Sequence, residues 1–234
     1  IESVLSRVQY DYLSKYFLSA SFRTDGSSRF HKDNRWGQFW SGGASWLITR
    51  EDFMKDIKWL DELKFKISYG TQGNDRLYNA EDYPQKVVSP WATQYLIVNN
   101  ADSPSLLPYS MGNEDLTWEK SHSFNTGIEF SVLKNRLYGG IEYFSRKTSN
   151  MLFDLRSPLS GGYATYPANI GDMTNRGVEF EITGRVIDTR DWKWDVNFNA
   201  THYKSKITKL PYDEVDNVLF NLKKGRDRYD YYLR

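Results

Sequence analysis

The chain has 234 residues, a mean hydropathy of −0.68 and a net charge of +1 from 31 basic and 30 acidic residues. It contains no run of about 18 apolar residues, which excludes a transmembrane helix, and its balanced charge gives no indication of a nucleic-acid partner. The absence of cysteine excludes disulfides, cysteine-based zinc sites and thiol nucleophiles. Because the sequence begins at Ile1 and not at a methionine, we expect it to be a piece of a longer protein.

Polar and apolar residues alternate along most of the chain. In "WKWDVNFNATHY" (192–203), Trp194 and Phe198 share one parity, and Asp195 and Asn199 share the other. Successive side chains of a strand point to opposite faces, so each such stretch has one apolar and one polar face. The pattern predicts eight strands, at 4–12, 16–23, 40–49, 63–70, 122–130, 136–146, 177–183 and 192–203.

The connections between these strands alternate in length. Short turns are expected at 13–15, 133–135 and 188–191, and long polar loops at 25–37, 71–114 and 154–172. In the remaining connection, 51–61, the spacing of Thr49 and Asp52 predicts a short helix with a capping box. In a meander every second connection lies at the same end, so one end has short turns and the other has long loops.

This asymmetry is typical of transmembrane β-barrels, whose strands are apolar outside and polar inside. We therefore predict an all-β fold, an antiparallel up-and-down meander of about eight or nine strands, with its apolar face toward lipid. The alternative is a soluble carbohydrate-binding β-sandwich, although a sandwich would usually have shorter strands and more even loops. The charges on the polar parity then face a wet lumen: Arg7, Asp11, Lys66, Glu129, Arg146, Glu179, Glu181 and Asp195.

The polar residues show no clear catalytic or metal-binding pattern. Glu179 and Glu181 share a strand face and would suit a glycosidase acid and base, but a lumen charge ladder is the simpler interpretation. His31, His122 and His202 are scattered and lack the spacing of metal ligands. We therefore expect no catalytic residues, no metal and no cofactor.

The long loops are where we expect contacts with other molecules. Aromatic rings on polar loops stack on sugars or dock a protein lid, and they can equally pack the loops against one another. The candidates for substrate or lid contact are Trp91, Tyr95, Tyr109, Tyr163 and Tyr166. In the loop "DGSSRF" (25–30), Asp25 and Gly26 suit a turn, and Arg29 is expected to anchor the loop to neighbouring carboxylates or carbonyls.

Several motifs resemble a known family of transporters. They are DGSSRF (25–30), RWG (35–37), SYG-x-x-GN (68–74), WE (118–119) and N-x-G-x-x-x-N-x-G-x-E (169–179). In this order, and over most of the chain, the sequence is similar to the SusC/RagA-type TonB-dependent outer-membrane transporters. One departure is "QFWSGG" after RWG, where Trp40 replaces the usual proline.

The resemblance implies part of an active transporter in the outer membrane of a Gram-negative bacterium, not an enzyme. Such proteins import oligosaccharides or peptides, are energised by TonB, and have a SusD-like surface lipoprotein as a lid. The expected partners are therefore outer-membrane lipid, the lipoprotein, TonB and a glycan or peptide substrate. The known barrel has 22 strands around a plug. Residues 1–234 would then be a partial, C-terminal barrel segment, with the plug domain, the TonB-contacting segment and the remaining strands outside this chain.

Overall fold

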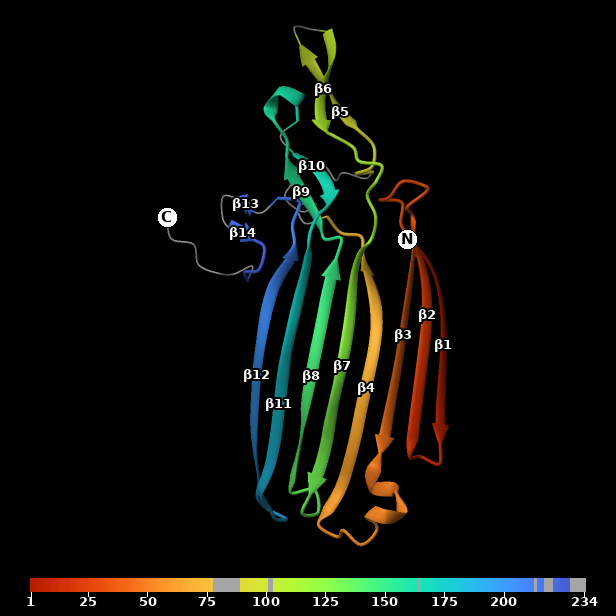
Figure 1. Ribbon diagram of the computed structural model, residues 1–234, viewed down its shortest axis with the longest axis vertical. Helices are drawn as coiled ribbons and strands as arrows, with labels where there is room; N and C mark the ends of the chain where they lie inside the picture. The colour runs from red at the N-terminus through yellow and green to blue at the C-terminus, as the bar shows by residue number, and fades with distance from the viewer. Residues whose placement is uncertain (78–88, 101–102, 164, 213, 217–220, 228–234) are drawn as a thin grey trace.

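The computed structural model describes residues 1–77, 89–100, 103–163, 165–212, 214–216 and 221–227. Among these residues no helix is long and apolar enough to cross a membrane. The described chain is dominated by long strands that run side by side, with smaller hairpins above one end (Figure 1).

Eight long strands form one sheet. Each strand pairs antiparallel with the next long strand along the chain, which confirms the predicted up-and-down meander. The sheet is open, and its edge strands are the first and the last members of the series. In order across the sheet the strands are β1 (Glu2–Tyr12), β2 (Tyr16–Gly26), β3 (Trp36–Leu47), β4 (Leu60–Asn74), β7 (Glu119–Val132), β8 (Leu137–Ser149), β11 (Asp172–Asp188) and β12 (Lys193–Lys209).

Four connections lie together at one end of the sheet, which we call the short-turn end (Figure 1). Three are the predicted tight turns, and hydrogen bonds join three neighbouring connections. Leu47 N–H donates to the Lys15 carbonyl at 2.7 Å, and Leu133 N–H donates to the Trp59 carbonyl at 3.0 Å. These bonds tie the first turn, the connection between β3 and β4, and the turn at 133–135 into one row.

The remaining connection, between β3 and β4, differs from the prediction. It contains two 3₁₀ turns, η1 (Ile48–Arg50) and η2 (Asp52–Met54), instead of one helix over 51–61. The predicted capping box is wrong, because neither turn has a side-chain cap. The Thr49 hydroxyl instead accepts a hydrogen bond from Leu63 N–H at 3.3 Å, so it joins the connection to the sheet.

The opposite end, which we call the loop end, carries three small hairpins that the alternation did not predict. The third lies beyond the last long strand, β12. The hairpins pair β5 (Gln94–Asn100) with β6 (Ser103–Ser110), β9 (Leu152–Arg156) with β10 (Thr165–Asn169), and β13 (Glu214–Asp216) with β14 (Asn221–Lys223).

The turn predicted at Asp25 and Gly26 is also wrong. Strand β2 continues through both residues, which pair with Gly37 and Trp36 of β3, and Gly26 does not have a positive φ. The sequence signal for a turn was overridden by continued pairing with β3. The chain instead leaves the sheet after Gly26, where Ser27 N–H bonds to the Arg35 carbonyl at 3.1 Å.

Candidate functional site

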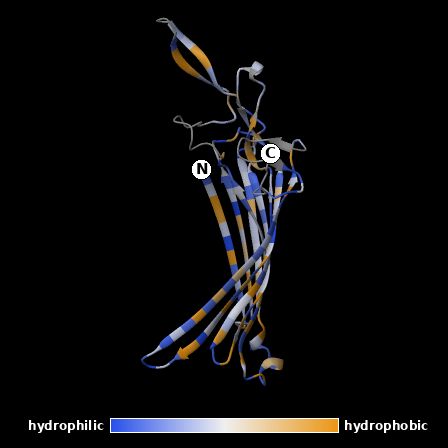
Figure 2. Cartoon of the chain, turned by 90° about the vertical axis from the view of Figure 1, so that its left-hand side faces the viewer, coloured by the Kyte–Doolittle hydropathy of each residue, from blue (hydrophilic) through white to orange (hydrophobic). Residues whose placement is uncertain are grey.

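The apolar parities of all eight strands meet on one face of the sheet, here called the apolar face. The register places Trp46 opposite Phe65, Phe65 opposite Ile128, and Ile182 opposite Phe198. Figure 2 shows the alternation of hydrophobic and hydrophilic residues along the strands. The face is not covered by a second layer of the described chain, since Phe198 is 57% exposed and Ile141 is 51% exposed.

This exposure decides between the two fold predictions. A β-sandwich buries one face of each sheet against another sheet about 10 Å away. Here the long strands form a single sheet, and its large apolar side chains remain uncovered by described residues. A continuous apolar face of this size needs an apolar environment outside the chain.

Aromatic side chains gather on the apolar face toward the short-turn end. Tyr10, Tyr12, Tyr16 and Trp46 form a stacked row across β1, β2 and β3, with successive ring centroids 6.2–6.5 Å apart. Trp194 begins the same face of β12 and is 55% exposed. Rings with an apolar body and a polar edge are typical of the boundary between membrane and water.

A polar hub fixes the connections at this end. The Glu51 carboxylate accepts hydrogen bonds from the Tyr16 hydroxyl at 2.6 Å, Lys15 Nζ at 3.0 Å and Trp46 Nε1 at 3.1 Å. These donors, the Tyr16 hydroxyl first, lower the pKa of Glu51 to about 2. Glu51 therefore stays ionised and joins the first tight turn to the connection between β3 and β4.

The opposite face of the sheet, the polar face, carries an ion-pair network near its centre. Lys66 Nζ lies 2.7 Å from Glu129 and 3.2 Å from Glu142, so one ammonium bridges carboxylates on β7 and β8. Arg185 contacts Asp195 at 3.6 Å nearer the short-turn end. Paired charges of both signs are typical of a surface that faces water.

The two glutamates considered as a catalytic pair lie on this polar face. Glu179 is directly opposite Glu142 on β8, and Glu181 accepts a hydrogen bond from Asn197 Nδ2 at 3.2 Å. In the described part of the chain neither carboxylate has a Lys or Arg nitrogen within 4 Å. The salt bridges of Lys66 therefore end at Glu142, which lies opposite Glu179, and they do not include Glu179 or Glu181. The three histidines lie in the β2–β3 loop, on β7 and on β12, and no described group of three His, Asp or Glu is placed to hold a metal.

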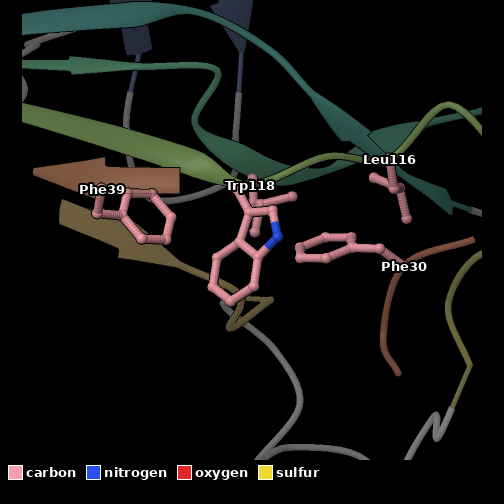
Figure 3. Packing of buried hydrophobic residues seen from close by; sticks show 5 residues of the cluster. Phe30, Phe39, Leu116 and Trp118 are labelled. Atoms are coloured by element: carbon pink, nitrogen blue, oxygen red, sulfur yellow. The ribbon is translucent and has the colours of Figure 1, made fainter. Parts of the chain in front are cut away.

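An aromatic cluster supports the loop end, and sequence reasoning missed it. Trp118 packs against Phe30 and Phe39 with ring centroids 5.3 and 5.5 Å apart, and its Nε1 donates to the Arg35 carbonyl at 3.0 Å (Figure 3). Leu116 is fully buried beside these rings. A Cβ at Gly73 would overlap the Phe39 ring, so this glycine gives the ring its place against the sheet.

Polar clamps join the loops around this cluster. Ser27 Oγ donates to buried Asp75 at 2.7 Å, and Arg29 Nη1 lies 3.3 Å from the Asp75 carbonyl and 3.5 Å from its carboxylate. Arg29 thus anchors its loop as predicted. Asn169 accepts from Thr117 N–H and donates to the Thr117 carbonyl, both at 2.8 Å. The motif residues at the loop end therefore have structural roles. The glycine, tryptophan and asparagine residues of these motifs were the sequence signal that could have predicted the cluster.

The structure separates the five aromatic candidates into different positions on the loop layer. Trp91 packs one loop on another, because Nε1 donates to the Ser28 carbonyl at 3.3 Å and its ring meets His31 edge-on at 5.5 Å. Tyr95 lies on β5, and burial raises the pKa of Tyr163, with a further contribution from the neighbouring Tyr95 hydroxyl.

Tyr109 and Tyr166 lie on β6 and β10, and both are half-buried. The structure therefore brings Tyr95 and Tyr163 together and places Trp91 in loop packing. Beyond these rings the β5–β6 hairpin projects above the loop layer with Ile97 79% and Leu106 68% exposed (Figures 1 and 2). The apolar run at 95–98 was the sequence signal for this hairpin.

Known proteins are similar to this chain over nearly its whole length. A family model described as "TonB dependent receptor-like, beta-barrel" matches residues 4–231. TonB-dependent receptor SusC of Bacteroides thetaiotaomicron is 36% identical over 233 residues, which are 99% of this chain and 22% of that protein. TonB-dependent receptor P3 of Formosa agariphila is 33% identical over 209 residues, covering 89% of this chain and 20% of that protein.

A similar fold is present in solved structures. The RagAB peptide importer in its "closed-closed" state matches with a TM-score of 0.85 and 29% identity, covering 96% of this chain and 24% of that chain. The "open-open" state of the same importer matches with a TM-score of 0.81. This chain therefore spans about a fifth of the length of the curated relatives that it matches.

Proposed function

We propose that this chain, which belongs to the TonB-dependent receptor-like β-barrel family, is part of the wall of an outer-membrane importer for oligosaccharides or peptides. The observation that carries the proposal is the unbroken apolar face over eight antiparallel strands, backed by a charged face. In a barrel wall the apolar face contacts lipid and the polar face lines the interior. The relatives are named as receptors and importers, which supports transport without chemistry.

A position in the barrel wall implies which end of the sheet faces the periplasm and which faces the outside of the cell. Outer-membrane barrels have short periplasmic turns and longer extracellular loops. The short-turn end would therefore face the periplasm, and the loop end would face the outside of the cell. The open edges at β1 and β12 would pair with strands of the remaining barrel, since an eight-stranded sheet is too small to enclose a plug.

The loop layer is the proposed meeting place with substrate and lid. Tyr95 and Tyr163 present neighbouring hydroxyl groups, and the β5–β6 hairpin exposes apolar side chains beyond them. Such a surface suits a SusD-like lipoprotein or an arriving substrate. Tyr109 and Tyr166 lie on two other strands of the loop end, β6 and β10, and Trp91 would act indirectly by holding its loop in place.

Uptake by the full-length protein tests this function. Cells that express it would be given fluorescent oligosaccharides and peptides of defined length, with and without a functional TonB. We expect accumulation of one class of substrate, and loss of that accumulation when TonB is absent. Uptake that is independent of TonB, or turnover of the substrate by the purified protein, would contradict the proposal.

A further inference from the structure

The apolar face becomes basic near the loop end. On β12 the outward residues Val196, Phe198 and Ala200 are followed by His202, Lys204 and Lys206. The same change occurs on the neighbouring strands, where apolar outward residues give way to Arg176 on β11, Lys147 on β8, and His122 and Lys120 on β7. Four adjacent strands thus turn from apolar to basic on the same face.

The pairing register brings three of these cations together. Arg176 lies directly opposite Lys204, and Thr174 lies opposite Lys206, one outward position further along. Directly paired residues have Cβ atoms about 4.5–5.5 Å apart, and like charges in such positions repel each other. We call Arg176, Lys204 and Lys206 the basic triad.

The triad residues form no salt bridge with a described residue. All three side chains are exposed, and none takes part in an ion pair within the described ranges. Lys147, by contrast, is paired with Asp172 at 3.5 Å. Three exposed cations gathered from two strands, none of them in a salt bridge with a described carboxylate, are suited to an anion that comes from outside the chain.

The position of the triad along the membrane normal indicates where that anion would lie. From Trp194 to Lys204 there are ten residues, about 34 Å along the strand at roughly 3.4 Å per residue. With a strand tilt of about 40°, this is roughly 26 Å along the membrane normal. The apolar band of outer-membrane barrels is about 25 Å tall, so the triad lies where the hydrocarbon ends and the outer headgroups begin.

We propose that the basic triad binds phosphate groups on the headgroups of lipids in the outer leaflet. The Arg176 guanidinium offers a planar fork of donors, and the two ammonium groups add positive charge beside it. A phosphorylated headgroup would neutralise the repulsion between the triad residues and hold the barrel wall at a defined height. The inference rests on the proposed function for its orientation, because it requires the loop end to be extracellular.

The test uses the full-length protein in non-ionic detergent. Retention of bisphosphorylated lipid A would be measured by native mass spectrometry, with dephosphorylated lipid A and inorganic phosphate as separate probes. Each Lys or Arg near a charged lipid surface contributes about a fivefold change in binding. The variant Arg176→Gln/Lys204→Gln/Lys206→Gln should therefore bind bisphosphorylated lipid A on the order of a hundredfold more weakly.

Two matched variants separate charge at this site from charge in general. Arg7→Gln/Arg146→Gln/Arg190→Gln removes three cations from the polar face and the short-turn end, and it should bind the lipid as wild type does. Arg176→Lys/Lys204→Arg/Lys206→Arg keeps the charge and should retain most of the affinity. Tight binding by the glutamine triad variant would overturn the proposal, as would equal binding of dephosphorylated lipid A or saturation by inorganic phosphate alone.

Bilayer insertion and heat-modifiable mobility on gels would be measured for every variant. If the wild-type protein does not insert, the proposed function itself fails. If it inserts but its lipid binding does not depend on phosphate, only the assignment of the triad fails.

Discussion

Phe198 and Asn199 provide a direct test of which face of the sheet contacts lipid. Phe198 lies on the apolar face, 57% exposed and with its ring 6.2 Å from Phe180. It is four residues beyond Trp194, about 14 Å along the strand and roughly 10 Å along the membrane normal. That position is close to the middle of an apolar band about 25 Å tall.

The expected cost follows from this depth. An arginine at the bilayer midplane of a barrel costs about 2–4 kcal/mol, and near an interface about 0–1 kcal/mol. Phe198→Arg should therefore lower the folding equilibrium constant by roughly 30- to 700-fold, since about 1.4 kcal/mol is tenfold. Trp194→Arg, at the interface, should cost about 1 kcal/mol or less.

Asn199→Arg is the matched control one residue away. Asn199 lies on the polar face, directly opposite Glu181. The new guanidinium would meet water and a carboxylate, so we expect a change within about 1 kcal/mol.

The measurement is urea unfolding of each full-length variant after folding into phospholipid vesicles. If Asn199→Arg destabilises the protein as much as Phe198→Arg, the apolar face does not contact lipid, and the barrel-wall interpretation is refuted.

Three further predictions concern packing and the two ends of the sheet. A Cβ at Gly177 would lie 2.6 Å from the His202 carbonyl, so Gly177→Ala should cost about 1–3 kcal/mol in urea unfolding, whereas Gly184→Ala, whose nearest neighbour is 3.8 Å away, should be nearly neutral. Trp118→Ala should loosen the loop end at a cost of about 3–5 kcal/mol, seen as faster proteolysis of the loops while the strands stay protected; unchanged proteolysis would contradict the cluster's role. Because the folded-state pKa of Glu51 is lowered to about 2, its stabilising contribution should be complete above its ordinary pKa of 4.5 and lost as the pH falls through about 2. Hydrogen exchange in residues 48–59 should report that loss, and in Glu51→Gln it should be raised at neutral pH and insensitive to this pH range.

Local sequence determined the strands, their two faces and the side on which the short turns lie. These features depend on a period of two and on connection length, both of which are properties of neighbouring residues. The predicted turns at 13–15, 133–135 and 188–191 were confirmed at one end for this reason. The capping box at Thr49 and the turn at Asp25 were wrong because hydrogen bonds to the next strand of the sheet overrode a local signal.

What only the tertiary structure decided is which residues from different strands meet. The Trp118 cluster draws side chains from loops more than 80 residues apart in the chain, as in the bond from Trp118 to the Arg35 carbonyl. Glu51 bonds to Tyr16 across the folded connection, and Arg176 lies opposite Lys204 through the register of strand pairing; neither follows from spacing along the sequence. Alternation assigns each residue to a face, but a shift of two residues in register keeps the faces and changes every cross-strand partner. The physical reason is that backbone pairing between strands sets the register, so the clusters form only once the whole sheet has assembled.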